Sequence, residues 1–89
     1  MTTAEPLLQL RAGYRLQFES AQQAWVLLFP EGMIQLNESA GMILKAFAEP
    51  RTVSAVIEDL QNAFPDADIR NDVLEFVAEA HEQRWLRTL

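Results

Sequence analysis

The sequence predicts an α+β domain: a three-stranded antiparallel sheet followed by three helices, similar in outline to a winged helix. Before residue 37, apolar residues either alternate with polar ones or form continuous runs, as in strands. After residue 37, they recur at helical spacing. The breakers agree with this division, because Pro30 and Gly32 separate two strand-like runs while Pro50 and Pro65 separate helix-like ones. We therefore expect the sheet to come first and the helices second.

Three segments have the pattern of strands. Residues 14–19 (YRLQFE) alternate between apolar and polar side chains, as in a strand with one buried face. Residues 24–29 (AWVLLF) are apolar throughout, which predicts a strand buried on both faces. Short connections favour a meander with 24–29 in the middle and with 14–19 and 33–36 as its two edges. Residues 1–11 are expected to be a flexible lead-in to a single domain of residues 12–89.

Three helices are expected after the last of these strands. Asn37 and Thr52 can cap the first two, and either Asp66 or Asp68 can cap the third. Residues 85–89 are either a frayed helix end or a short terminal strand. Each helix has an apolar stripe at the spacing i, i+3, i+4 and i+7, made by Ala40, Ile43, Leu44 and Phe47, by Val53, Val56, Ile57, Leu60 and Phe64, and by Ile69, Val73, Phe76, Val77 and Ala80.

Composition limits the possible functions. The chain has 89 residues, a net charge of −6 and no cysteine, which excludes disulfides and thiol catalysis and is typical of a reducing cytoplasm. No stretch approaches the roughly 18 apolar residues of a membrane span, and the first residues lack the pattern of a signal peptide. Nucleic-acid backbones require clustered Lys and Arg, which are missing here. We expect a cytoplasmic protein with neither a membrane nor a nucleic acid as partner.

Catalytic and metal-binding patterns are also missing. His81 is the only histidine, and so late in a helix it is better interpreted as a partner of the helix dipole than as a ligand or a base. Residues 66–77 faintly resemble a calcium loop, but Asn71 takes the place of its glycine and Val77 that of its final glutamate. We expect no catalytic residue, no metal and no cofactor, and we interpret Glu75, Glu79 and Glu82 as a solvated helix face.

Two features could serve binding instead. An extended peptide could pair with the short edge strand at 32–36, although composition alone favours a blunt edge kept short to avoid aggregation. The third helix carries more apolar residues than packing on one side requires, although most of them will be core. The additional apolar residues could line a groove between this helix and the edge strand, together with Met33 and Met42.

A longer ordered pattern also carries information. Its most specific piece is LLFPEGM at residues 27–33, and further pieces follow in order at 51–57, 64–68 and 76–87. From about residue 11 to residue 87, the chain resembles the PqqD family, small accessory proteins of pyrroloquinoline quinone (PQQ) biosynthesis.

The resemblance implies a peptide chaperone and not an enzyme. Such proteins bind the ribosomal precursor peptide PqqA and present it to PqqE, a radical S-adenosylmethionine enzyme that joins a Glu and a Tyr side chain of the peptide. In these domains the peptide adds as a strand beside the third strand and packs against the third helix. The peptide-binding residues implied here are Gly32, Met33, Ile34, Gln35, Leu36 and Asn37 on the strand, and Val73, Phe76, Val77 and Ala80 on the helix.

Several alternatives stay open. The chain could instead bind or carry the quinone product or an intermediate, which would stack on Trp25, Phe76 and Trp85. Arg84 and Arg87 are few positive charges for binding an anionic cofactor. A winged-helix DNA binder is disfavoured because the third helix is acidic. The acidic second and third helices could face a basic surface of PqqE. The chain is expected to be a monomer or a weak homodimer, formed by pairing open edges or by exchanging N-terminal strands.

Overall fold

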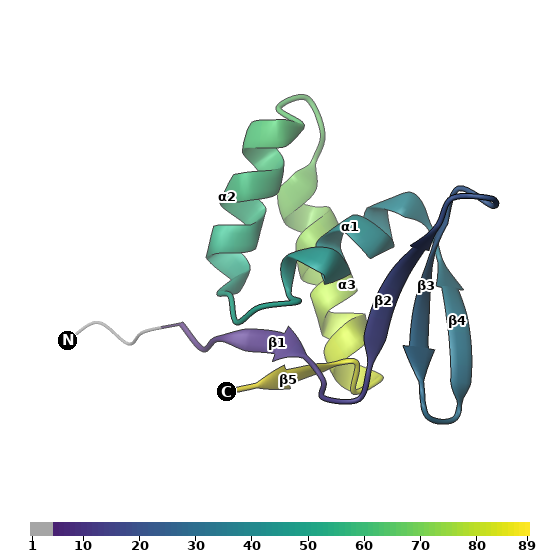
Figure 1. The fold of residues 1–89 in the computed structure, drawn as a ribbon. Coiled ribbons are helices and arrows are strands. Elements are labelled where there is room, and N and C mark those ends of the chain that lie inside the picture. Colours follow the sequence, from purple (N-terminus) through teal and green to yellow (C-terminus); the bar gives the residue numbers. More distant parts are fainter. Residues whose placement is uncertain (1–4) are drawn as a thin grey trace.

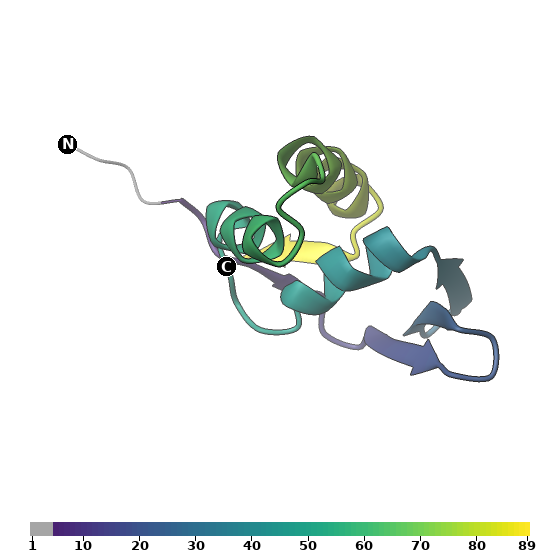
Figure 2. The same cartoon turned by 90° about the horizontal axis from the view of Figure 1, so that it is seen from above.

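The structure, a computed structural model, describes residues 5–89 (Figure 1). Strands β2, β3 and β4 form a three-stranded antiparallel sheet in that order, and β1 and β5 form a separate two-stranded sheet. Both views place α1 between the three-stranded sheet and the pair α2 and α3 (Figures 1 and 2). The predicted fold class is therefore confirmed. The elements are β1 (Leu8–Leu10), β2 (Arg15–Glu19), β3 (Ala24–Phe29), β4 (Gly32–Leu36), α1 (Glu38–Ala46), α2 (Val53–Ala63), α3 (Ile69–Glu82) and β5 (Leu86–Thr88).

The meander is organised around β3. Leu27 pairs with Leu16 of β2 on one side and with Ile34 of β4 on the other. Its side chain is fully buried in the main core, and the adjacent Val26, which points to the opposite face, is also buried. The centre of β3 is thus buried on both faces, as its unbroken apolar sequence predicts.

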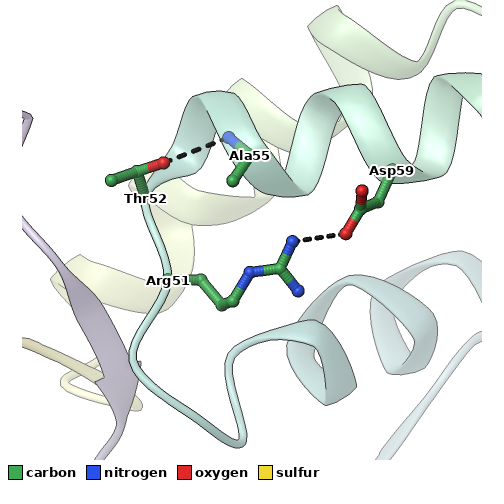
Figure 3. A network of polar contacts seen from close by, with 4 residues as sticks. All are labelled: Arg51, Thr52, Ala55 and Asp59. Carbon is green, nitrogen blue, oxygen red and sulfur yellow. Dashed lines mark hydrogen bonds and ion pairs between the residues drawn. The ribbon is translucent and has the colours of Figure 1, made fainter.

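The ends of the helices explain where each begins. The side chain of Asn37 accepts a hydrogen bond from the backbone N–H of Ala40 at 2.8 Å, and the side chain of Thr52 accepts one from the N–H of Ala55 at 3.1 Å (Figure 3). Both predicted caps are confirmed. At α3 the N-cap position belongs to Asp68, but its side chain makes no capping hydrogen bond to the backbone.

The N-terminal segment departs from the prediction. We expected residues 1–11 to be a flexible lead-in, and this is wrong for Leu8–Leu10, which form β1 and pair antiparallel with Leu86–Thr88. Leu8 is buried, and it exchanges backbone hydrogen bonds of 2.8 and 3.0 Å with Arg51. Two apolar residues in a segment of three give no readable periodicity, which is why the strand was missed. Residues 1–4 of the expected lead-in lie outside the described part of the chain.

The same pairing decides the interpretation of the C-terminus. Of the two alternatives for residues 85–89, the terminal strand is correct, because β5 pairs with β1. Trp85, just before β5, is buried, and its backbone N–H donates to the carbonyl of Ala80 at 2.8 Å. The strands β1 and β5 are therefore held side by side under the helices (Figure 1).

Polar contacts fix the start of α2. Arg51 forms an ion pair with Asp59, two turns into the helix (Figure 3). The carboxylate of Glu5 accepts hydrogen bonds from the hydroxyl and from the backbone N–H of Ser54, the latter at 3.3 Å. A carboxylate at this end of a helix is favoured by the helix dipole. The N-terminal segment thus holds α2 as well as β5.

Candidate functional site

One edge of the three-stranded sheet is open at β4. Within residues 5–89, β4 pairs with β3 alone, so the backbone along its other side has no strand partner. Met33 is 68% exposed, Ile34 is half-buried, and Leu36 is buried against the core. The strand is thus anchored at its end, where it leads into α1, while its outer edge is accessible. Such an edge can pair with an extended peptide.

A groove begins where this edge strand ends. It is a hollow of about 340 Å³ between α1 and α3, and we call it the α1–α3 groove. Figure 2 shows α1 lying between α3 and the sheet. The groove adjoins the end of β4 because Asn37, the residue directly after this strand, lines it. Its lining consists of Asn37 at the end of β4, Ser39, Ala40 and Ile43 on α1, and Asp72, Glu75, Phe76 and Glu79 on α3.

The floor and the rim of the α1–α3 groove differ in chemistry. Ile43 is buried and Phe76 is half-buried, so both contribute an apolar base. Asp72, Glu75 and Glu79 are exposed along one side of α3. An extended segment that leaves the β4 edge at Asn37 would thus meet an apolar surface bordered by carboxylates.

The structure separates the four helix residues of the predicted site. Phe76 lines the α1–α3 groove. Val73 and Ala80 are fully buried in the core and hold α3 in position. Val77 is half-buried against the same core and lines none of the hollows described here. The strand residues Gly32–Leu36 form the open edge, and Asn37 joins it to the groove.

Of the α1 residues, sequence reasoning placed only Met42 in the lining of the groove, together with Met33 of β4. The α1–α3 groove includes neither, because Met42 lines a neighbouring hollow and Met33 is exposed on β4. Ser39, Ala40 and Ile43 line the groove although none of them was predicted. The signal was present: α1 begins directly after β4, so its first two turns must lie beside the end of the edge strand. Glu75 and Glu79 were interpreted, together with Glu82, as a solvated helix face, and the structure places these two at the rim of the groove beside Asp72.

The aromatic residues of the quinone-binding alternative do not share one site. Trp25 packs edge-on against Phe18, with ring centroids 5.1 Å apart, and lines a different hollow together with Lys45. Trp85 is buried, with its ring centroid 6.3 Å from that of Phe76. These residues therefore do not form a common stacking surface.

Two kinds of feature are absent from the described residues. Between residues 5 and 89, no group of three or more His, Asp or Glu side chains is arranged to hold a metal ion. None of the helices in this part of the chain is both long enough and apolar enough to span a membrane.

Comparison with known proteins places the chain in a family. Several relatives carry the name PqqA binding protein. The one from Azotobacter vinelandii is 45% identical over 86 residues, covering 96% of this chain and 94% of the relative. The one from Acinetobacter baumannii is 49% identical over 77 residues, with 85% and 82% covered. The one from Pseudomonas aeruginosa is 49% identical over 78 residues, with 86% and 85% covered.

A solved structure and a family model agree with these relatives. The solution NMR structure is that of the PqqD truncation of Methylobacterium extorquens PqqCD, described as a functional, stand-alone recognition element for ribosomally synthesised and post-translationally modified peptides. It is 32% identical, superimposes with a TM-score of 0.74, and covers 91% of this chain and 88% of its own. The family model for coenzyme PQQ synthesis protein D (PqqD) matches residues 24–86. This chain belongs to the PqqD family.

Proposed function

We propose that this chain binds the precursor peptide PqqA by adding a peptide strand to β4, and that it presents the peptide to the radical S-adenosylmethionine enzyme PqqE. The observation that carries the proposal is the continuity between the edge of β4, which has no strand partner among residues 5–89, and the α1–α3 groove, joined at Asn37. The name of the relatives, PqqA binding protein, supports the choice of ligand.

The geometry suits a carrier. Backbone pairing along β4 fixes the register of a peptide with little demand on its sequence, and side chains entering the groove supply selectivity. Ordering a disordered peptide costs about 2–5 kcal/mol, so a moderate net affinity is expected. A peptide held in this way can be transferred, and holding it close to an enzyme raises its effective concentration there.

The proposed partner enzyme rests on the family resemblance and on charge. Residues 49–89 contain nine acidic residues and four arginines, and α2 and α3 present many of these acids at the surface. A basic surface on PqqE would complement them. We place this function in the cytoplasm, in a monomer or a weak homodimer, and assign no catalytic step to the chain itself.

An amide-resolved NMR titration of the labelled protein with PqqA tests the proposal. We expect saturable shifts concentrated in Gly32–Leu36, Asn37 and the groove residues of α1 and α3. Shifts confined to β2 or to the β1–β5 sheet would contradict the proposed site, and no shift at high peptide excess would remove peptide binding as the function. Adding PqqE to the saturated complex tests presentation: we expect a ternary complex by size-exclusion chromatography, whereas release of the free carrier and a PqqE–peptide pair alone would contradict it.

A further inference from the structure

A second hollow adjoins the α1–α3 groove. It measures about 210 Å³ and lies where α1 meets the C-terminal end of α2 and the N-terminal end of α3; we call it the helical pocket. Ser39, Ile43 and Asp72 line both hollows, so the groove continues directly into the pocket. The remaining lining of the helical pocket is Glu38, Met42, Leu60, Phe64, Ala67, Ile69 and Val73.

The helical pocket is mainly apolar and partly open. Phe64 follows the last turn of α2 and leaves 42% of its surface exposed beside the hollow. Met42, Leu60 and Ile69 are half-buried around it. A large apolar side chain from another molecule would therefore bury its own surface and that of Phe64, and such burial is favourable in proportion to the apolar area removed from water.

The charges around the two hollows are all of one sign. Among the residues that the structure describes, four carboxylates line them, those of Glu38, Asp72, Glu75 and Glu79, and no Lys, Arg or His does. Within residues 5–89, none of these four forms an ion pair. Asp72, Glu75 and Glu79 also lie on one side of α3, at spacings of three and four residues that make like charges repel. A ligand cation would relieve this repulsion.

We infer that the helical pocket receives a large apolar side chain of the same bound peptide, and that a neighbouring Lys or Arg of the peptide pairs with Asp72 where the two hollows meet. The inference rests on the proposed function, because the peptide reaches the pocket along the β4 edge and through the α1–α3 groove. The negative charge around the two hollows favours a peptide that carries a cation over a second copy of this chain. A second copy of this chain, with a net charge of −6, would bring further negative charge to the same rim.

Calorimetric titration of the intact protein with PqqA tests the pocket through single substitutions. Phe64→Ala removes the exposed wall, and Ala67→Phe fills the hollow from its rim without removing a core contact. We expect each to weaken peptide binding about tenfold. The matched control is Leu74→Ala, because Leu74 is exposed to nearly the same extent, 43%, and lines none of the hollows described here. It should change the affinity less than about twofold.

The cation is tested by a double-mutant cycle. Asp72→Asn should weaken binding about threefold to tenfold at low salt and less at high salt, whereas Glu58→Gln, on an exposed position of α2 away from both hollows, should have little effect. Each Lys or Arg of PqqA is replaced in turn by Gln. For one of them the loss should not add to that of Asp72→Asn.

The outcomes separate the inference from the function on which it rests. If the unmodified protein binds PqqA but Phe64→Ala and Ala67→Phe bind it equally well, the helical pocket is not used and strand addition at β4 still stands. If the two losses in the cycle are additive for every basic residue, the pairing with Asp72 is wrong. If the unmodified protein fails to bind PqqA, the proposed function and this inference fall together.

Discussion

Gly41 of α1 lies directly against the indole of Trp25 in β3. A Cβ atom placed on Gly41 would be 2.1 Å from Cγ and Cδ1 of Trp25 and 2.6 Å from its Cβ, far inside van der Waals contact. The helix therefore meets the sheet across a residue without a side chain. This close approach sets the position of the first turns of α1, and with them Ala40 and Ile43 on the groove side.

Gly41→Ala should consequently destabilise the domain. Helix propensity alone predicts a gain of about 1 kcal/mol from this change, but forcing a methyl group against backbone-adjacent atoms of Trp25 costs about 1–3 kcal/mol or more. We expect a net loss in the free energy of unfolding measured in urea. Combining the change with Trp25→Ala should cost less than the sum of the two single changes. A more stable Gly41→Ala protein would contradict the contact.

The N-terminal strand should contribute strongly to stability. Leu8 is 5% exposed and the adjacent Leu7 is 43% exposed. Leu8→Ala should therefore lower the free energy of unfolding by about 2–5 kcal/mol, whereas Leu7→Ala should change it by less than about 0.5 kcal/mol. Equal effects of the two substitutions in urea denaturation would show that β1 does not hold the fold together.

Much of this fold could be predicted from the sequence, and the missing part has a physical reason. The change of period near Asn37, the turn at Pro30 and Gly32 and the caps at Asn37 and Thr52 are local signals, which neighbouring residues carry by themselves. The β1–β5 sheet is not local, because Leu8–Leu10 find their partners at the other end of the chain. Gly41 is similar: its role depends on a tryptophan in another element.

Part of the candidate site could also be predicted from the sequence, and part depends on tertiary packing. The open edge at 32–36 followed from the order of short connections, whereas Phe76 was implied, with Val73, Val77 and Ala80, by the family resemblance. The lining of the groove by Ser39, Ala40 and Ile43 depends on how α1 packs between the sheet and α3, which periodicity does not give. The burial of Val73 and Ala80 likewise depends on the tertiary packing of α3.

The helix caps should differ in strength. Asn37 caps the backbone of α1, whereas the carboxylate of Asp68 accepts instead from the side chain of Asn71 at 2.8 Å. Asn37→Ala should cost about 1 kcal/mol of stability, and Asp68→Ala should cost less than about 0.5 kcal/mol. Urea denaturation of the two variants checks the difference, and a larger loss for Asp68→Ala would contradict the assignment of the caps.

Two neighbouring residues of α3 should separate binding from packing. Phe76 lines the α1–α3 groove, and Val77 packs only against the core. Both Phe76→Ala and Val77→Ala should lower the free energy of unfolding. Phe76→Ala should in addition weaken binding of PqqA about tenfold, while Val77→Ala should leave the affinity within about twofold of the original. Calorimetry below the unfolding transition of both variants measures this, and equal affinities would remove Phe76 from the site.

Amide hydrogen exchange of β4, with and without saturating PqqA, tests strand addition most directly. Because β4 pairs on one side only within residues 5–89, those of its amides that face outward exchange without protection from a partner strand. Pairing with a peptide strand should slow their exchange markedly, while the amides at the outer edge of β2 remain unchanged. If PqqA binds and no amide of Gly32–Leu36 gains protection, the peptide does not add to β4 and the account is wrong.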